Sequence, residues 1–209
     1  WMSPRMAWRA IQSALPKNAI ISSDIGNNCA IGNAYPSFDE GRKYLAPGLF
    51  GPCGYGLPSI VGAKIGQPHV PVVGFAGDGA FGIAVNELTA IGRDEWPAVT
   101  QIVFRNYQWG AEKRNSTLWF DDNFVGTELD TKVSYAGIAQ ACGLLGVQVQ
   151  TMDELTAVLN QAIKDQMENN KTTVIEVILN QELGEPFRRD AMKKPVQVAG
   201  VTAADMAAE

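Results

Sequence analysis

Short apolar runs alternate along the chain with longer segments in which apolar residues recur at helical spacing. Runs that are brief, apolar and rich in β-branched residues are typical of buried strands. They predict strands at residues 19–22, 70–76, 100–105, 146–149 and 172–179. The helical spacing predicts helices at residues 3–15, 57–65, 84–92, 133–142 and 153–168.

Local signals mark some ends of these elements. Pro4 stands near the first position of the first helix, where its missing N–H costs nothing. Thr151-Met-Asp-Glu154 has the pattern of a capping box and predicts the start of the helix at residues 153–168. Residues 41–56 are rich in glycine and proline, and residues 112–130 are polar and aromatic without clear periodicity. We expect a substrate loop in the second of these stretches.

The alternation of strands and helices predicts an α/β fold, in which a mostly parallel sheet is covered on both faces to give three αβα layers. Residues 1–180 form the predicted α/β domain. Residues 181–209 carry charges, proline and small residues, and they are expected to form a tail that is partly irregular or disordered.

The turn Gly77-Asp78-Gly79 follows a predicted strand, and 26 residues separate it from Asn106, which follows another. The carboxyl ends of parallel neighbouring strands meet at one sheet edge, where ligands of open α/β sheets bind. Backbone N–H groups at a glycine-rich turn favour phosphate, but a carboxylate beside a phosphate needs a cation between them. Oxygen donors suit Mg²⁺ or Ca²⁺. The pairing therefore predicts a divalent cation bridged to a diphosphate.

Two other interpretations of this turn stay open. Residues 77–82 also fit G-x-G-x-x-G, the dinucleotide fingerprint, which is a weak signal on its own. Against a nicotinamide or flavin site, Asp78 would face a pyrophosphate without a metal, and the next strand ends in Arg105-Asn106 without an acidic residue. The second alternative is a purely structural Gly-Asp-Gly turn.

Gly-Asp-Gly, a spacer of this length and an asparagine resemble the signature of thiamine diphosphate enzymes. That family usually has Asn-Asn where this chain has Arg105-Asn106. The resemblance implies thiamine diphosphate and Mg²⁺ as cofactors. It also implies that the side chains of Asp78 and Asn106 and the backbone oxygen of Gln108 ligate the metal.

Two further stretches carry the same resemblance. Ser23-Asp-Ile-Gly-Asn-Asn28 resembles the loop that reaches the diphosphate, and Gly51-Pro-Cys-Gly-Tyr-Gly-Leu-Pro58 resembles the segment that grips the aminopyrimidine. Cys53 stands where the family has a bulky apolar wedge. The implied cofactor-binding residues are Gly26, Asn27, Asn28, Gly51, Cys53, Gly77, Asp78, Gly79, Ala80, Asn106, Gln108 and Gly110.

Residues 104–120 and 180–190 are similar to the sulfoacetaldehyde acetyltransferase branch of this family. This resemblance implies conversion of sulfoacetaldehyde and phosphate to acetyl phosphate and sulfite, in the breakdown of taurine-like sulfonates. Lys113, Arg114 and Trp109 are candidate contacts for substrate or phosphate, with solvated surface and ordinary packing as their alternatives. For the whole chain, the alternatives are an acetolactate synthase-like carboligase domain and an inert cofactor-binding or assembly module.

The glutamate that activates the cofactor comes, by resemblance, from the amino-terminal domain of a neighbouring subunit. A chain of 209 residues cannot also hold the family's amino-terminal and middle domains. We therefore expect a carboxyl-terminal fragment of a homo-oligomeric enzyme that lacks turnover by itself. None of Glu40, Glu87 and Glu112 is assigned the activating role.

Composition excludes several other classes. A net charge of −5 argues against a nucleic-acid partner, and a hydrophobic content of 46% is ample for a core. Cys29, Cys53 and Cys142 are odd in number and widely spaced, which indicates a reducing compartment. No apolar stretch approaches membrane-spanning length, so no membrane contact and a cytoplasmic location are expected. His69, the sole histidine, falls at the wrong sheet edge for a Ser-His-Asp site.

Overall fold

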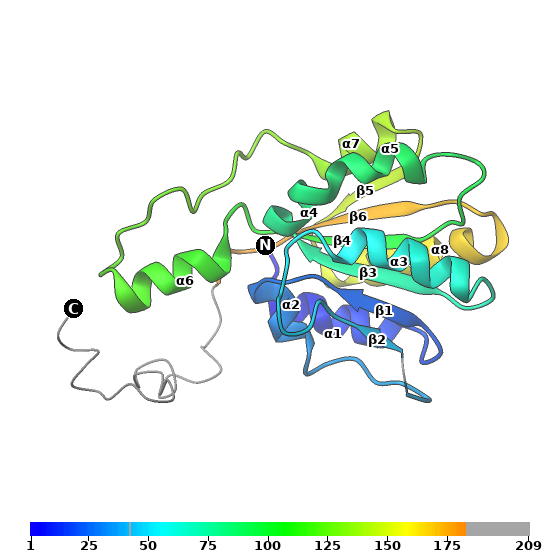
Figure 1. Ribbon diagram of the computed structural model, residues 1–209, viewed down its shortest axis with the longest axis horizontal. Helices are drawn as coiled ribbons and strands as arrows, with labels where there is room; N and C mark the ends of the chain where they lie inside the picture. Colours follow the sequence, from blue (N-terminus) through cyan, green and yellow to red (C-terminus); the bar gives the residue numbers. More distant parts are fainter. Residues whose placement is uncertain (42, 183–209) are drawn as a thin grey trace.

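A computed structural model describes residues 1–41 and 43–182 of the chain. Its centre is a six-stranded sheet in which all neighbouring strands are parallel and the order is β2-β1-β3-β4-β6-β5 (Figure 1). The strands are β1 (Ile20–Ser23), β2 (Tyr44–Leu45), β3 (Val72–Gly77), β4 (Thr100–Arg105), β5 (Leu145–Val149) and β6 (Thr173–Ile178). Parallel neighbours need crossover connections, which the helices supply.

One face of the sheet packs against α1 (Pro4–Ala14), α2 (Asn27–Gly32) and α8 (Met152–Glu168). Trp8 of α1 lies at the centre of this layer, with its ring 4.7 Å from that of Phe75 and 5.3 Å from that of Phe104. Its indole N–H donates to the backbone oxygen of Asn28 at 2.8 Å. Trp8 therefore joins α2 to the sheet and fixes the segment that leads out of β1.

The opposite face packs against α3 (Gly56–Gly66), α4 (Asp78–Ala84), the 3₁₀ turn η1 (Val85–Glu87), α5 (Leu88–Ile91) and α7 (Tyr135–Ala141). Its core includes Leu57, Ile60, Phe81 and Leu88 against Val72 and Val103. Both faces of the sheet are thus covered by helices, and the predicted three-layer αβα fold with a parallel sheet is confirmed.

Strand register brings three loops to one edge of the sheet. Ser23 at the end of β1 pairs with Phe75, and Gly77 at the end of β3 pairs with Phe104 of β4. The residues that follow these strands, Asp24, Asp78 and Asn106, therefore leave the sheet at its carboxyl edge. His69 lies on an exposed turn before β3, at the opposite edge, as expected.

The five predicted strands are present with ends shifted by two residues or fewer, and the strand at residues 100–105 has the predicted bounds. The capping box at Thr151 and Glu154 is confirmed, because each side chain bonds to the backbone of the other residue. The helix expected at residues 84–92 is present up to Ile91, but it starts earlier than predicted. Helical structure begins at Asp78, directly after β3, and continues through α4, η1 and α5.

Three elements were not predicted. Residues 112–130 were expected to lack regular structure, but α6 (Gly110–Trp119) occupies the first part of this stretch. None of its residues is buried, so the sequence carries no apolar stripe that marks a helix. In Figure 1, α6 stands apart from the layered body. The six-residue α2 and the two-residue β2 are too short to give a periodic signal.

No helix within residues 1–41 and 43–182 is both long and apolar enough to span a bilayer. Most of the expected tail, from residue 183 on, lies outside the described residues. The predicted division at residue 180 therefore stays a prediction.

Candidate functional site

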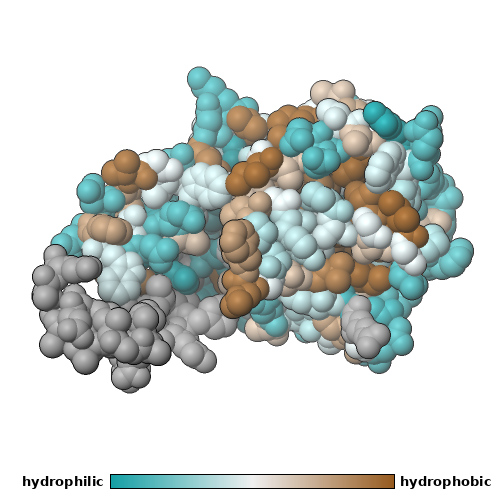
Figure 2. Space-filling model, in the orientation of Figure 1, coloured by the Kyte–Doolittle hydropathy of each residue, from teal (hydrophilic) through white to brown (hydrophobic). Residues whose placement is uncertain are grey.

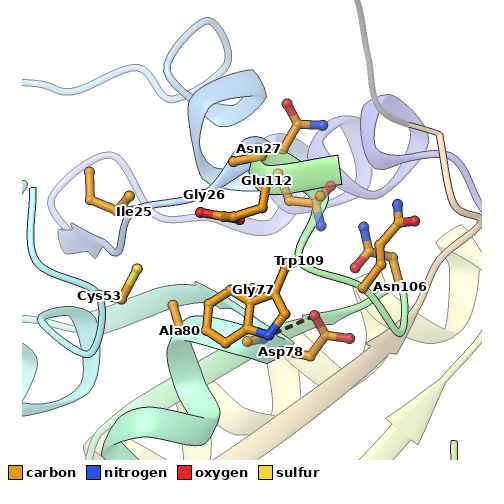
Figure 3. Close-up of a pocket in the computed structure, with 15 residues that line it drawn as sticks. Ile25, Gly26, Asn27, Cys53, Gly77, Asp78, Ala80, Asn106, Trp109 and Glu112 are labelled. Carbon is orange, nitrogen blue, oxygen red and sulfur yellow. Dashed lines mark hydrogen bonds between the residues drawn. The ribbon is translucent and has the colours of Figure 1, made fainter. Parts of the chain in front are cut away.

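A pocket opens at the carboxyl edge of the sheet, between the ends of β1, β3 and β4 and the start of α6 (Figure 3). All the residues predicted to bind a cofactor line it except Gly51, which lies against Ile25 of the pocket wall. Three lining residues were not predicted: Ile25, Ala111 and Glu112. Ile25 lies within the motif at residues 23–28, and Ala111 and Glu112 lie within the stretch at residues 104–120, so these motifs could have predicted their place in the pocket.

Asp78 stands on the floor of this pocket at the first position of α4, and it is 1% exposed. Its Oδ2 accepts from the backbone N–H of Tyr107 at 2.7 Å and from Arg105 at 3.2 Å, and its Oδ1 accepts from the N–H of Gly79 at 3.0 Å. Burial raises the pKa of this carboxyl to about 6, although Arg105 and the two N–H groups oppose the rise.

The turn after β4 directs two oxygen donors at Asp78. Tyr107 has φ of +60°, a left-handed conformation that costs a non-glycine residue about 1–2 kcal/mol. Asn106 and Gln108 flank Tyr107 in the sequence. One terminal atom of the Asn106 amide lies 3.3 Å from Asp78 Oδ1 and 3.2 Å from the backbone oxygen of Gln108. With nitrogen at that position the amide donates to both oxygens; with oxygen there, three oxygen donors converge.

The opposite wall comes from the segment after β1. Gly26 has φ of +142°, and a Cβ there would meet nothing within 4 Å, so the backbone faces open space. Asn28 is buried, and its Oδ1 has no hydrogen-bond partner among the described residues. Gln108 Oε1, on the β4 side, shares that property. Buried polar atoms without partners are uncommon and mark a place where a ligand completes the hydrogen bonding.

Asp24 fixes the loop that carries Cys53. Its carboxylate accepts from the N–H groups of Gly54 at 3.1 Å and Gly56 at 2.7 Å, so the loop before α3 is held onto the end of β1. Burial raises the pKa of Asp24, and these N–H groups oppose the rise. Cys53 is thereby placed on the pocket wall opposite Asn106 (Figure 3).

Trp109 lies over the Gly77–Ala80 turn (Figure 3). A Cβ at Gly79 would approach the indole ring to 2.7 Å, so the ring requires glycine at this position. Glu112 points into the same space from α6. The indole and the carboxylate narrow the pocket on the α6 side.

The two candidate cations of α6 differ in their surroundings. Lys113 pairs with Glu128, and its ammonium lies 5.2 Å from the ring centre of Phe124. Arg114 lines a second hollow that shares Ile25, Gly26 and Asn27 with the first. Its guanidinium donates to Asn27 Oδ1 at 3.3 Å, while its buried Nε has no partner among the described residues.

Within residues 1–41 and 43–182, no group of three or more histidine, cysteine, aspartate or glutamate side chains is placed to hold a metal ion. The convergent donors are one carboxylate, one amide and one backbone carbonyl. Such a set suits a hard cation that takes oxygen ligands.

This fold and pocket are those of a cofactor-binding domain, and comparison identifies its class. Residues 24–177 match the family described as "Thiamine pyrophosphate enzyme, C-terminal TPP binding domain". The chain belongs to this family. The matched range runs from Asp24, directly after β1, to Val177 of β6, and it contains every residue of the pocket.

Individual relatives bear closely related sequences. The chain is 83% identical over 206 residues to the sulfoacetaldehyde acetyltransferase of Roseovarius nubinhibens, a match covering 99% of this chain and 34% of that protein. It is 77% identical over 206 residues to the sulfoacetaldehyde acetyltransferase of Rhodobacter capsulatus, covering 99% of this chain and 35% of that protein. The chain therefore spans about a third of the length of these curated relatives.

Solved structures confirm the fold. The thiamine diphosphate-dependent 4-hydroxybenzoylformate decarboxylase of Rhodococcus jostii RHA1 superposes with a TM-score of 0.74 at 22% identity, covering 87% of this chain and 33% of that one. At this identity the likeness supports the fold alone.

Proposed function

We propose that the chain is the cofactor-binding third of a thiamine diphosphate-dependent enzyme that converts sulfoacetaldehyde and phosphate to acetyl phosphate and sulfite. The observation that carries this proposal is the 83% identity to a sulfoacetaldehyde acetyltransferase over almost the whole chain. An acetolactate synthase-like carboligase and an inert assembly module are the alternatives that the experiments below separate.

The residues of the pocket fit Mg²⁺ as the partner of the diphosphate. One terminal atom of the Asn106 amide lies 3.3 Å from Asp78 Oδ1 and 3.2 Å from the backbone oxygen of Gln108. With its oxygen turned toward the other two, Asn106 would complete a set of three oxygen ligands, the kind of ligand that Mg²⁺ prefers, and the diphosphate would supply further oxygens. The amides of Asn27 and Asn28 then serve the diphosphate from the opposite wall.

The bound cofactor supplies the electron sink that cleavage of the carbon–sulfur bond requires. The chain's own residues bind and orient it. Cys53 supports the cofactor from the pocket wall, and Trp109 and Glu112 limit the space above it. A glutamate from a neighbouring subunit would handle the proton of the cofactor, so the chain by itself is expected to give no turnover.

Arg114 is the residue that we assign to the anionic end of the substrate or to phosphate. Its hollow adjoins the cofactor pocket, and its Nε lacks a partner among the described residues, whereas the ammonium of Lys113 is already neutralised by Glu128. A guanidinium suits the geometry of sulfonate and phosphate oxygens.

The two cations provide a matched pair of variants. A hydrogen bond to a charged group contributes about 1.5–3 kcal/mol, so Arg114→Gln is expected to raise KM for sulfoacetaldehyde or phosphate by about tenfold or more. Lys113→Gln should change either KM by less than about fivefold, because an exposed ion pair contributes about 0–1 kcal/mol. Steady-state kinetics with each substrate varied in turn measures both. Equal effects of the two variants would remove Arg114 from the substrate site.

We also propose that the site is completed in a homo-oligomer in the cytoplasm, within the catabolism of taurine-like sulfonates. Large hydrophobic side chains are exposed in segments near the pocket, among them Leu49, Phe50, Trp119 and Phe120. Figure 2 shows a band of hydrophobic surface between the lobe that carries α6 and the layered body. Such surface is typical of a face covered by another protein domain.

The decisive assay uses an assembled enzyme in which this chain replaces the corresponding third of the Roseovarius nubinhibens relative. With thiamine diphosphate and Mg²⁺, we expect it to release sulfite and form acetyl phosphate from sulfoacetaldehyde and phosphate. Acetolactate formation from pyruvate without sulfite release would favour the carboligase alternative. Absence of cofactor binding in calorimetry would favour the inert module, and acetyl phosphate formation by the chain alone would refute the need for a second domain.

Thiol labelling tests the cofactor position independently of activity. Cys29 is buried, and burial raises its pKa to about 12, so it should stay unlabelled in the folded protein. Cys53 and Cys142 are half-buried. Thiamine diphosphate with Mg²⁺ is expected to slow maleimide labelling of Cys53 and to leave the rate at Cys142 unchanged, as followed by peptide mass spectrometry. Labelling of Cys53 at the same rate with and without cofactor would place the cofactor elsewhere.

A further inference from the structure

Arg105 is a fully buried arginine next to the candidate metal ligands. Its side chain is 1% exposed, and it is the last residue of β4, directly before Asn106. A buried guanidinium is costly unless its charge is paired and its N–H groups are bonded. The groups that compensate the Arg105 guanidinium are Asp78 of the pocket, Glu176 of β6 and the backbone of residues 130–133.

Two carboxylates flank the guanidinium. Arg105 Nη1 lies 3.2 Å from Asp78 Oδ2, and its Nε lies 3.6 Å from Oε1 of Glu176 in β6. Glu176 is itself 1% exposed and is held through Oε2, which accepts from Ser134 at 3.0 Å and from the N–H of Ala136 at 3.2 Å. Glu176 is thus a fixed anchor for the arginine.

The remaining faces of the guanidinium are enclosed as well. Nη2 donates to the backbone oxygens of Asp130 at 2.5 Å and Val133 at 3.1 Å. The ring centre of Tyr107 lies 4.3 Å from the guanidinium carbon, and that of Tyr135 lies 5.2 Å away. These contacts surround the guanidinium, and a flexible ammonium could not make the same set of bonds.

The consequence falls on the two oxygens of Asp78. Oδ2 accepts from both Arg105 and the N–H of Tyr107, so its bonding capacity is used inside the protein. Oδ1 accepts from the N–H of Gly79 and lies 3.3 Å from the terminal atom of the Asn106 amide that also approaches the Gln108 carbonyl. The carboxylate is therefore held with one oxygen turned inward and the other turned toward the converging donors.

We propose that Arg105, anchored by Glu176, is a positioning residue of the cation site: it fixes the Asp78 carboxylate so that Oδ1 is presented to the metal. This inference rests on the proposed function of the pocket. Partners that orient metal ligands change metal affinity by about 10–100-fold when they are removed.

Electrostatics alone predicts the opposite change in metal affinity, so the direction of the change distinguishes the two explanations. A cation close to a metal site repels the metal, so loss of the arginine charge would tighten metal binding if positioning were unimportant. If orientation dominates, loss of the arginine weakens metal binding. In that case Arg105→Lys also fails to restore the affinity, because lysine keeps the charge but lacks the rigid fork of donors.

The experiment titrates Mn²⁺ into the assembled enzyme at saturating thiamine diphosphate, with free Mn²⁺ followed by electron paramagnetic resonance. Arg105→Gln, Arg105→Lys and Glu176→Gln are compared with the wild type and with Arg93→Gln, an exposed arginine outside the pocket. Circular dichroism melting confirms that each variant is folded at the temperature of the titration. Arg105→Lys, which retains the buried charge, serves as the second variant if Arg105→Gln does not fold.

We expect Arg105→Gln to weaken Mn²⁺ binding about 10–100-fold, Arg105→Lys to remain about tenfold weaker than wild type, and Glu176→Gln to show a smaller loss. Unchanged or tighter binding in Arg105→Gln overturns the proposal, and so does wild-type affinity in Arg105→Lys. If the wild type shows no metal-dependent cofactor binding, the proposed function itself is wrong. If the wild type binds the metal and the variants bind it equally well, only the positioning role of Arg105 is wrong.

Discussion

Asp78→Ala is expected to abolish metal-dependent binding of thiamine diphosphate and, in the assembled enzyme, the release of sulfite. The carboxylate supplies the only charged donor among the three groups that converge at the pocket floor. Loss of a partner that merely orients a ligand weakens metal binding about 10–100-fold, so loss of the ligand itself should weaken it by about 100-fold or more. Calorimetry with Mg²⁺ at fixed cofactor concentration measures this change.

Folding and binding must be separated in this variant, because Asp78 is also the buried partner of Arg105. Removing one member of a buried ion pair costs about 3–5 kcal/mol when the other charge is left uncompensated. Asp78→Asn keeps the volume and an oxygen for Arg105, and it should lose metal binding with less loss of stability. Asp39→Ala, on the exposed surface, is the matched control. Metal-dependent cofactor binding of normal strength in Asp78→Asn would contradict the cation site.

Gly146→Ala is expected to destabilise the fold by about 3 kcal/mol or more, at the upper end of the range for overpacked interiors. A Cβ on Gly146 of β5 would stand 2.0 Å from the backbone oxygen of Ala136 in α7. No rotation of a side chain relieves a clash with a main-chain atom, so α7 must move away from the sheet. Urea unfolding followed by far-ultraviolet circular dichroism measures the loss.

The displacement of α7 should also reach the pocket, since Tyr135 of this helix donates its hydroxyl to the backbone oxygen of Asp78 at 2.8 Å. Gly62→Ala is the control for a glycine-to-alanine change. A Cβ there meets nothing within 4 Å, and alanine in a helix interior is favoured over glycine by about 1 kcal/mol. A Gly146→Ala variant as stable as Gly62→Ala would show that β5 and α7 are not packed as described.

Buried strands were the part of the fold most readily predicted from the sequence. The run at residues 100–105 is fully buried, and its apolar and β-branched residues predict a strand from the local sequence alone. By contrast, α6 has no buried residue, so nothing in its spacing distinguishes it from a loop. Its placement beside the pocket follows from the turn at Tyr107 and from the bonds of Trp109 and Gln108 to the segment at residues 127–128, which are contacts between distant residues.

The candidate site divides in the same way. The spacing of Asp78 and Asn106 after two strands was enough to predict that both emerge at one edge, because parallel strands share their direction. The surroundings of the two cationic side chains of α6 could not be predicted from the sequence. Lys113 and Arg114 are adjacent and chemically alike, yet one pairs with Glu128 and the other lines a hollow beside Asn27. Which way each side chain turns depends on helix phase and on partners far along the chain.

Five strands, most of the helices, the family and the residues at the carboxyl edge could be read from the sequence, because periodicity and motif spacing are visible along the chain. The tertiary structure alone decided that Arg105 is enclosed between Asp78 and Glu176, from three different elements of the fold. A charged residue at the end of a strand gives no sign of burial until the elements that surround it are packed together.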